Sequence, residues 1–186
     1  MLTAKAMAAG ELHRTDPSGV ELLDVEHDAI PYDRMVCPFM DRVARKWEAL
    51  PRTEGERLPP WSAFSPQAFK TELTRLCVLQ AEDWRADRIE FTLYGAHPTD
   101  FIGGGKALSM QAMRASAALR ANYEDIRDRA GRAIDRGLPQ YARKTMSWAS
   151  RGYIEYEVLM LPFAPTGDGR QRLLQPASAW LGSHPL

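Results

Sequence analysis

The sequence has little of what several classes of protein depend on. Its 186 residues include two cysteines, Cys37 and Cys77, which are too few and too far apart for a disulfide framework or a cysteine metal site. None of its four histidines lies at metal-ligand spacing from another histidine or a cysteine. No apolar run is long enough to span a bilayer. We therefore expect two free thiols, no metal site and no association with a membrane.

Charge of one sign is not in excess either. Lysine and arginine together number 24, aspartate and glutamate also number 24, and the formal net charge is +0. A broad basic surface for nucleic acid is therefore not expected. The first ten residues are small and weakly apolar, and charged residues follow at once, unlike a secretory signal peptide. This pattern favours the cytoplasm.

What the sequence does have is a strand-rich C-terminal stretch. Residues 141–180 predict three strands in succession, with turns at 150–152 and 165–169. Residues 153–161 concentrate β-branched and aromatic side chains and give the strongest strand signal. Glu155 and Glu157 alternate there with apolar neighbours, and we interpret them as solvated side chains on one face, not as a catalytic pair.

Two further strands are predicted at residues 76–81 and 88–95, joined by a polar hairpin loop. Together with the C-terminal three they make a five-stranded antiparallel sheet. Such a sheet needs a second layer over its apolar face. The fold class expected is therefore α+β.

Helices are predicted on either side of the first strand pair. Residues 31–50 carry an apolar stripe at steps of three and four, and the helix there either starts near Pro38 or kinks at it. A short helix is expected at 66–73. After a turn of helix at 98–102 and three glycines, Ser109 can cap a long helix reaching Arg136, with a break near 121–122 as an alternative.

These elements divide the chain into two parts. Residues 1–30 show little periodicity and predict a loosely structured arm, in which Leu22, Leu23 and Val25 are the one candidate for a short element. Residues 31–186 predict a single domain that includes the first helix.

Short motifs spread over residues 40–181 carry a resemblance to a known family. Residues 89–95, IEFTLYG, resemble the family's strand that ends in glycine. Residues 157–163, EVLMLPF, resemble its terminal Glu-x-Leu-x-Leu-Pro-Leu strand, with Phe163 in place of leucine. The smaller matches are Trp47 and Leu50 followed by Leu58-Pro59, then Phe64-Ser65-Pro66, Gly104 with Leu108, and Gly137-Leu138-Pro139. Together with the element order, they resemble a family of small bacterial PAS-like domains, mostly single-domain proteins of uncertain role.

The resemblance implies a sensory or regulatory domain, not a catalyst. PAS domains typically hold a small molecule between the sheet and the helical insert, or pair through the helix before the first strand. Haem and flavin, two familiar cofactors of such domains, are disfavoured. Residues 109–136 contain no histidine for a haem, and residues 98–137 contain no cysteine for a flavin photosensor.

Two functional hypotheses follow, and a third, an enzyme, has no catalytic signature to support it. The first is a regulatory domain that binds a small apolar or amphipathic ligand and signals by association. Its candidate pocket residues are Tyr94, Phe101, Met113, Tyr141 and Trp148. The second is a ligand-free module that forms a homodimer or docks a signalling protein. Its candidate interface is the stripe of Val36, Phe39, Val43 and Trp47 on the first helix.

Overall fold

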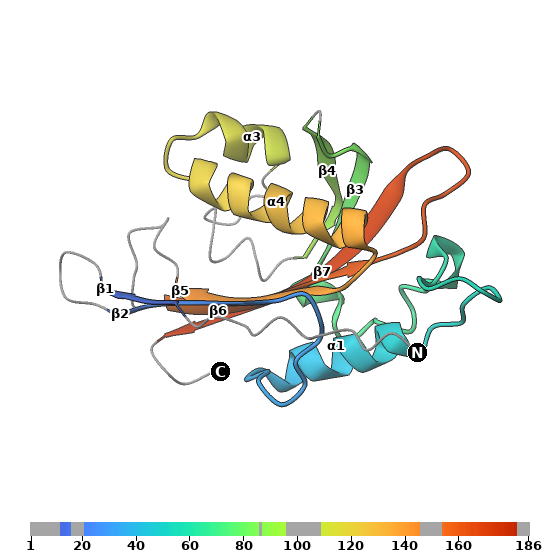
Figure 1. Cartoon of the computed structure of the whole chain (residues 1–186), viewed down its shortest axis with the longest axis horizontal. Helices are drawn as coiled ribbons and strands as arrows, with labels where there is room; N and C mark the ends of the chain where they lie inside the picture. The colour runs from blue at the N-terminus through green and yellow to red at the C-terminus, as the bar shows by residue number, and fades with distance from the viewer. Residues whose placement is uncertain (1–11, 16–20, 86, 96–108, 146–153, 182–186) are drawn as a thin grey trace, which may run out of the picture.

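The computed structural model describes residues 12–15, 21–85, 87–95, 109–145 and 154–181. These residues form an α+β fold around one antiparallel sheet (Figure 1). Its strands are β1 (Leu12–Thr15), β2 (Glu21–His27), β3 (Leu76–Asp83), β4 (Arg88–Tyr94), β5 (Gln140–Thr145), β6 (Ile154–Pro162) and β7 (Gln171–Leu181). They lie in the order β1-β2-β5-β6-β7-β3-β4, and each neighbouring pair is antiparallel.

The sheet is wider than the sequence predicts. The five expected strands are present as β3 to β7, but the described residues form seven strands, not five. The candidate short element at Leu22, Leu23 and Val25 is confirmed as β2, which pairs with β5 from Asp24 to His27. The arm that is otherwise expected to be loose also contains β1. Val25 is buried, while Asp24 and Glu26 meet Lys144. Such distant partners leave no local signal in the sequence.

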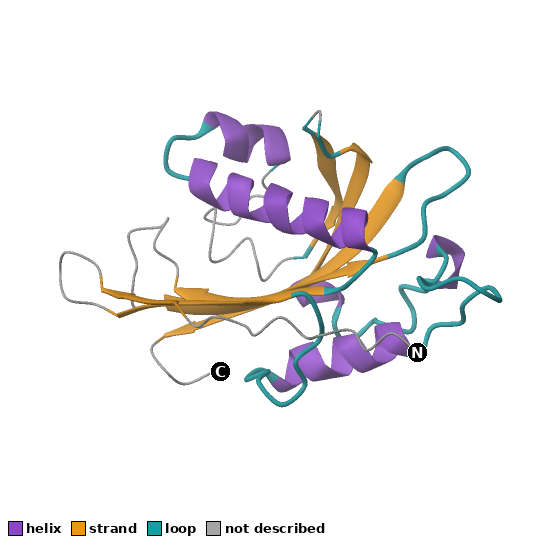
Figure 2. Ribbon diagram, in the orientation of Figure 1, coloured by secondary structure: helices purple, strands orange, loops and turns teal. Residues whose placement is uncertain are grey.

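The helices cover both faces of the sheet (Figure 2). Helix α1 (Pro38–Glu48) lies on one face, and helices α3 (Met110–Ala115) and α4 (Arg120–Arg136) lie on the other. Side chains along each strand alternate between these layers. Leu159 and Leu161 of β6 therefore pack in the core under α1, and Met160 packs in the core under α4.

Helix α1 begins as one of the two sequence readings predicts, with Pro38 in its first turn. Its stripe does not form an interface. Phe39 and Trp47 are each 4% exposed, and Val43 is 0% exposed, because they pack against the sheet. Val36, just before the helix, is half-buried. The predicted docking surface is thus part of the core. An apolar stripe in the sequence does not by itself distinguish a helix face buried in the core from one that docks a partner.

The predicted long helix is two helices. The Ser109 hydroxyl accepts a hydrogen bond from the Ala112 amide and caps α3, as expected. The chain then leaves helical geometry at residues 116–119, earlier than the predicted break, and resumes as α4. Gly137, in the left-handed conformation with φ of 58°, ends α4 as predicted. At residues 66–73 the structure has turns and the start of a 3-10 helix (Leu73–Arg75) in place of the short helix expected.

Because Gly131 has no side chain, helix α4 can lie in close contact with Trp84 of the β3–β4 turn. A β-carbon there would lie 2.7 Å from two ring carbons of Trp84. The same indole donates from Nε1 to Asp135, 3.2 Å away. The absent side chain therefore lets the turn lie directly against α4.

A buried carboxylate joins α1 to the sheet. Glu157 of β6 is 0% exposed. Its Oε2 accepts from the backbone amide of Cys37 at 2.9 Å, and its Oε1 accepts from that of Val36 at 2.9 Å. The Tyr141 hydroxyl donates to the same Oε1 at 2.8 Å. The expectation that Glu157 is solvated is wrong, because it satisfies amides at the start of α1, where negative charge is also favoured.

We predict that Glu157→Gln lowers the free energy of unfolding by about 2–4 kcal/mol, because a neutral amide replaces the charged acceptor that faces three donors in the core. Glu155→Gln is the matched control. Glu155 is 19% exposed and pairs with Arg143 at 2.7 Å, so its loss should cost less than about 1 kcal/mol. Chemical denaturation of the three proteins measures both. Equal costs for the two variants would contradict the role given to Glu157.

Candidate ligand-binding cleft

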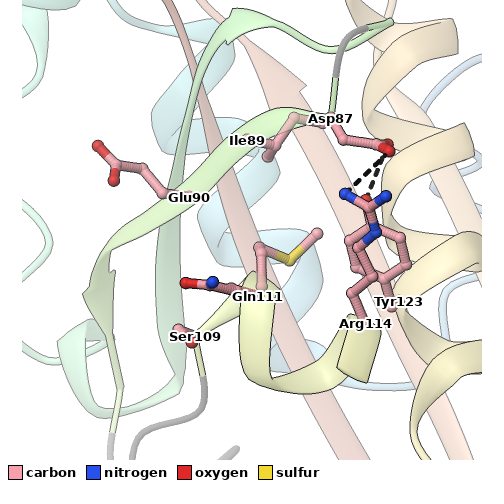
Figure 3. A pocket seen from close by; sticks show the side chains of 8 residues that line it. Asp87, Ile89, Glu90, Ser109, Gln111, Arg114 and Tyr123 are labelled. Carbon is pink, nitrogen blue, oxygen red and sulfur yellow. Dashed lines mark hydrogen bonds and ion pairs between the residues drawn. The ribbon is translucent and has the colours of Figure 1, made fainter. Parts of the chain in front are cut away.

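A cleft of about 380 Å³ opens between strand β4 and helix α3 (Figure 3). Ile89 and Met110 give it a buried apolar floor. Its polar lining comes from the β3–β4 turn, β4, α3 with its N-cap, and α4, and consists of Asp87, Glu90, Ser109, Gln111, Arg114 and Tyr123. The hollow is thus amphipathic, and its volume suits a small organic molecule.

Asp87 is the centre of the polar side. The Tyr123 hydroxyl donates to Oδ1 at 2.8 Å, and Nη1 of Arg127 donates to the same oxygen at 3.4 Å. Nη1 of Arg114 lies 3.3 Å from Oδ2. Asp87 also has a φ of 58°, a conformation that non-glycine residues adopt at a cost in free energy. Backbone strain and converging donors at one position are features common at binding sites.

These contacts fix the protonation states in the cleft. The hydrogen bond from Tyr123 is the main cause that holds the pKa of Asp87 below its usual range. Burial raises this pKa by a smaller amount, and the charges of Arg114 and Arg127 lower it further. Burial, together with the neighbouring carboxylate, raises the pKa of Tyr123. Near neutral pH the cleft therefore contains a carboxylate at Asp87 and a neutral phenol at Tyr123.

Glu90 lines the cleft without facing its polar cluster. Its Oε1 lies 3.5 Å from Nε2 of Gln80. Figure 3 shows the Glu90 side chain directed away from Asp87 and Arg114. The charges that meet inside the cleft are therefore those of Asp87 and Arg114.

Of the predicted pocket residues, the structure describes the side chains of two, Met113 and Tyr141, and it does not bring these two together. Met113 of α3 is buried in the core between α3, α4 and the sheet. Tyr141 lies on the opposite face of the sheet, where its hydroxyl donates a hydrogen bond to Glu157. Those two side chains cannot line one pocket. Tyr94 belongs to β4, but its side chain is outside the description, and Phe101 and Trp148 lie outside the described residues.

Sequence reasoning missed the residues that do form the cleft. The sequence predicts only that Asp87 belongs to a polar hairpin loop. Its partners Tyr123 and Arg127 lie 36 and 40 residues away in the sequence, so no local pattern connects them to it. The local signal available was the cap at Ser109, which places the start of α3 but not its neighbours.

A second polar cluster lies between α4 and the strands β2, β5 and β6. Arg129 is 1% exposed and pairs with Asp125. Nζ of Lys144 lies 2.9 Å from Asp125 and 2.5 Å from Glu26, and Arg132 meets Glu26 at 2.8 Å. Burial alone would raise the pKa of Asp125, but the charges of Arg129 and Lys144 outweigh it and hold the pKa below its usual range. The cluster is ionised and ties α4 to the N-terminal strands.

Comparison with known proteins gives no relative: no family model, no curated protein and no solved structure matches the chain. Within the described ranges, no helix has the length and apolar character needed to cross a membrane. Nor do the described side chains gather into a group of three or more histidine, cysteine, aspartate or glutamate residues that could hold a metal ion. The cleft and the contacts around it are therefore the features from which a function can be inferred.

We predict that Tyr123→Phe raises the pKa of Asp87 toward its usual value, because the variant loses the hydrogen bond that contributes most to lowering it. A carboxyl with a lowered pKa stabilises the folded state above its unfolded pKa, and this contribution is lost as the pH falls through the folded pKa. On acidification, the variant should therefore protonate Asp87 at a higher pH than the unmodified protein.

The side-chain carboxyl carbon shift of Asp87, followed by NMR from pH 7 down to pH 2, measures this difference. Tyr156→Phe is the control, because the Tyr156 hydroxyl contacts Asp125 instead. An Asp87 titration unchanged by Tyr123→Phe would show that the hydroxyl does not set the pKa.

Proposed function

We propose that the chain is a PAS-like sensory or regulatory domain that binds a small amphipathic molecule in the cleft between β4 and α3. The observation that carries the proposal is the cleft itself, with an apolar floor at Ile89 and Met110 and a polar cluster around Asp87. It lies beside α3 and α4, which come between β4 and β5 in the chain.

The element order supports the PAS-like part of the proposal. The described residues between 38 and 181 form, in chain order, α1, two short 3-10 helices, β3 and β4, α3 and α4, and the three antiparallel strands β5 to β7. The strands of this part lie in the order β4-β3-β7-β6-β5, so its first and last strands, β3 and β7, are neighbours. Strands β2 and β1 extend the sheet beyond β5 and are an addition to the pattern that the resemblance implies.

The composition of the cleft favours an amphipathic ligand over a purely apolar one. Met113, a predicted pocket residue, packs with Ile126 and Ala130 as core under α3 and α4. Buried polar groups in a site are satisfied by a ligand that offers matching polar groups. A ligand with one apolar and one polar end fits these walls.

Helix α4 supports a regulatory role, because it contacts both the cleft and the N-terminal strands. Near its start, Tyr123 and Arg127 bind Asp87. Near its end, Arg132 and Arg136 pair with Glu26 and Asp28 of the β2 region. A ligand that displaces the start of α4 therefore acts on a rigid element that also holds β2, which is the physical requirement for coupling two sites.

The alternative function, a ligand-free interaction module, loses its expected surface, since the α1 stripe is buried. Association with a signalling partner or a second copy of the chain remains part of the proposal as the way the signal leaves the domain. It would use a surface other than that stripe.

We predict that the protein binds one small molecule per chain in the cleft. Native mass spectrometry, after incubation with the small-molecule fraction of a cell extract, should show a stoichiometric excess mass that is lost on denaturation. Arg114→Gln should reduce the bound fraction. Arg42→Gln is the control, because Arg42 lies on α1 and is 57% exposed, against 59% for Arg114. An apo mass alone, or equal loss in both variants, would contradict a ligand in this cleft.

We also predict that weakening the cleft end of α4 loosens β2. Asp87→Asn removes the negative charge to which Tyr123 and Arg127 donate. Amide hydrogen exchange should therefore become faster in Glu21–His27 as well as around the cleft. Asp41→Asn is the control, because it breaks the exposed Asp41–Arg45 pair on α1. Faster exchange confined to residues 83–95 and 109–127 would contradict coupling through α4.

A further inference from the structure

We propose that the cleft selects an organic anion, a monocarboxylate with a short apolar body, whose carboxylate binds Arg114. This inference rests on the proposed function, because it names the class of ligand for the same cleft. It depends on which polar groups in the cleft already have partners and which do not.

Arg114 is the group with unused donors. A guanidinium carries five N–H donors in a fixed fork that matches a carboxylate. Among the described residues, Arg114 makes no hydrogen bond, and its one charged neighbour is Asp87, at 3.3 Å. Its side chain is 59% exposed on the rim of the cleft. It is therefore free to turn toward an incoming carboxylate.

Asp87 does not depend on Arg114. It keeps the hydrogen bond from Tyr123 at 2.8 Å and the contact with Arg127 at 3.4 Å when Arg114 leaves. Both contacts are to Oδ1. Because the charge of Arg127 remains beside the carboxylate, Asp87 attracts an incoming ammonium group less strongly than an unpaired carboxylate would. Asp128 is likewise occupied, since it accepts from Arg127 at 2.8 Å. After the exchange, Arg114 pairs with the ligand carboxylate, and Arg127 is shared between Asp87 and Asp128.

The remaining carboxylate of the cleft does not oppose an anion at this position. Glu90 is directed away from Arg114, toward Gln80 at 3.5 Å (Figure 3). On the inner side, Ile89 and Met110 are 6% and 3% exposed and offer an apolar surface next to Arg114. The ligand body therefore lies on this floor while its carboxylate remains at the rim.

Three probes with the same six-carbon body and different head groups test the inference: hexanoate, hexylamine and 1-hexanol. Each is titrated into the full chain and followed by amide NMR at neutral pH. Hexanoate should shift the amides of residues 87–90 and 109–114 saturably. It should bind about tenfold more tightly than either other probe, because a charge-assisted pair with Arg114 is available to it alone.

Variants of Arg114 test the residue assignment. Arg114→Gln should weaken hexanoate binding about tenfold, while Arg114→Lys, which keeps the charge without the fork, should weaken it less. Arg42→Gln should leave the affinity unchanged. Because Arg114 is an exposed rim residue, the amide spectra of its variants should otherwise match the unmodified protein.

The outcomes separate the two proposals. Hexylammonium binding as tightly as hexanoate would overturn anion selection and leave the cleft as a ligand site. Hexanoate binding that is unchanged in Arg114→Gln would overturn the role of Arg114. Cleft amides that none of the three probes shifts would overturn the inference and the proposed ligand site together.

Discussion

The structure depends on one buried carboxylate. Glu157 stands at the middle of the sheet, and burying its charge without partners would cost several kcal/mol. Two amides at the start of α1 and the Tyr141 hydroxyl supply those partners. Because the carboxylate and the helix start satisfy each other, α1 can lie against the sheet in one position, and its apolar stripe closes that face.

The opposite face carries the proposed binding site. Successive residues of β6 belong to the two layers: Glu157 meets α1, while Tyr156 contacts Asp125 of α4 at 3.3 Å. On the α1 face an apolar core dominates. On the α4 face, ion pairs and a cleft accompany the apolar core, and these are the contacts that a ligand or a change in charge can rearrange. We propose that the α1 layer is structurally fixed and supports the α4 layer, whose contacts rearrange when a ligand binds.

The sequence predicts those parts of the fold that have local signals. Strand alternation locates β3 to β7, and Pro38, Ser109 and Gly137 mark helix ends, since each acts on its own neighbours in the chain. It does not predict the role of Glu157, whose amide partner Cys37 lies 120 residues away, or the pairing of β2, whose Glu26 meets Arg132 across 106 residues. The cleft is missed for the same reason. The buried α1 stripe shows the other limit, because core and interface share one pattern.

Hydrogen exchange of the unmodified protein tests the division between the two faces most directly. If Glu157 holds α1 to the sheet, the amides of α1 should exchange as slowly as those of β6, through global unfolding. The amides of α3, which lie beside the cleft, should exchange faster than both. An α1 that exchanges as fast as α3, or faster, would contradict the account, because the layer described as fixed would then open independently of the sheet.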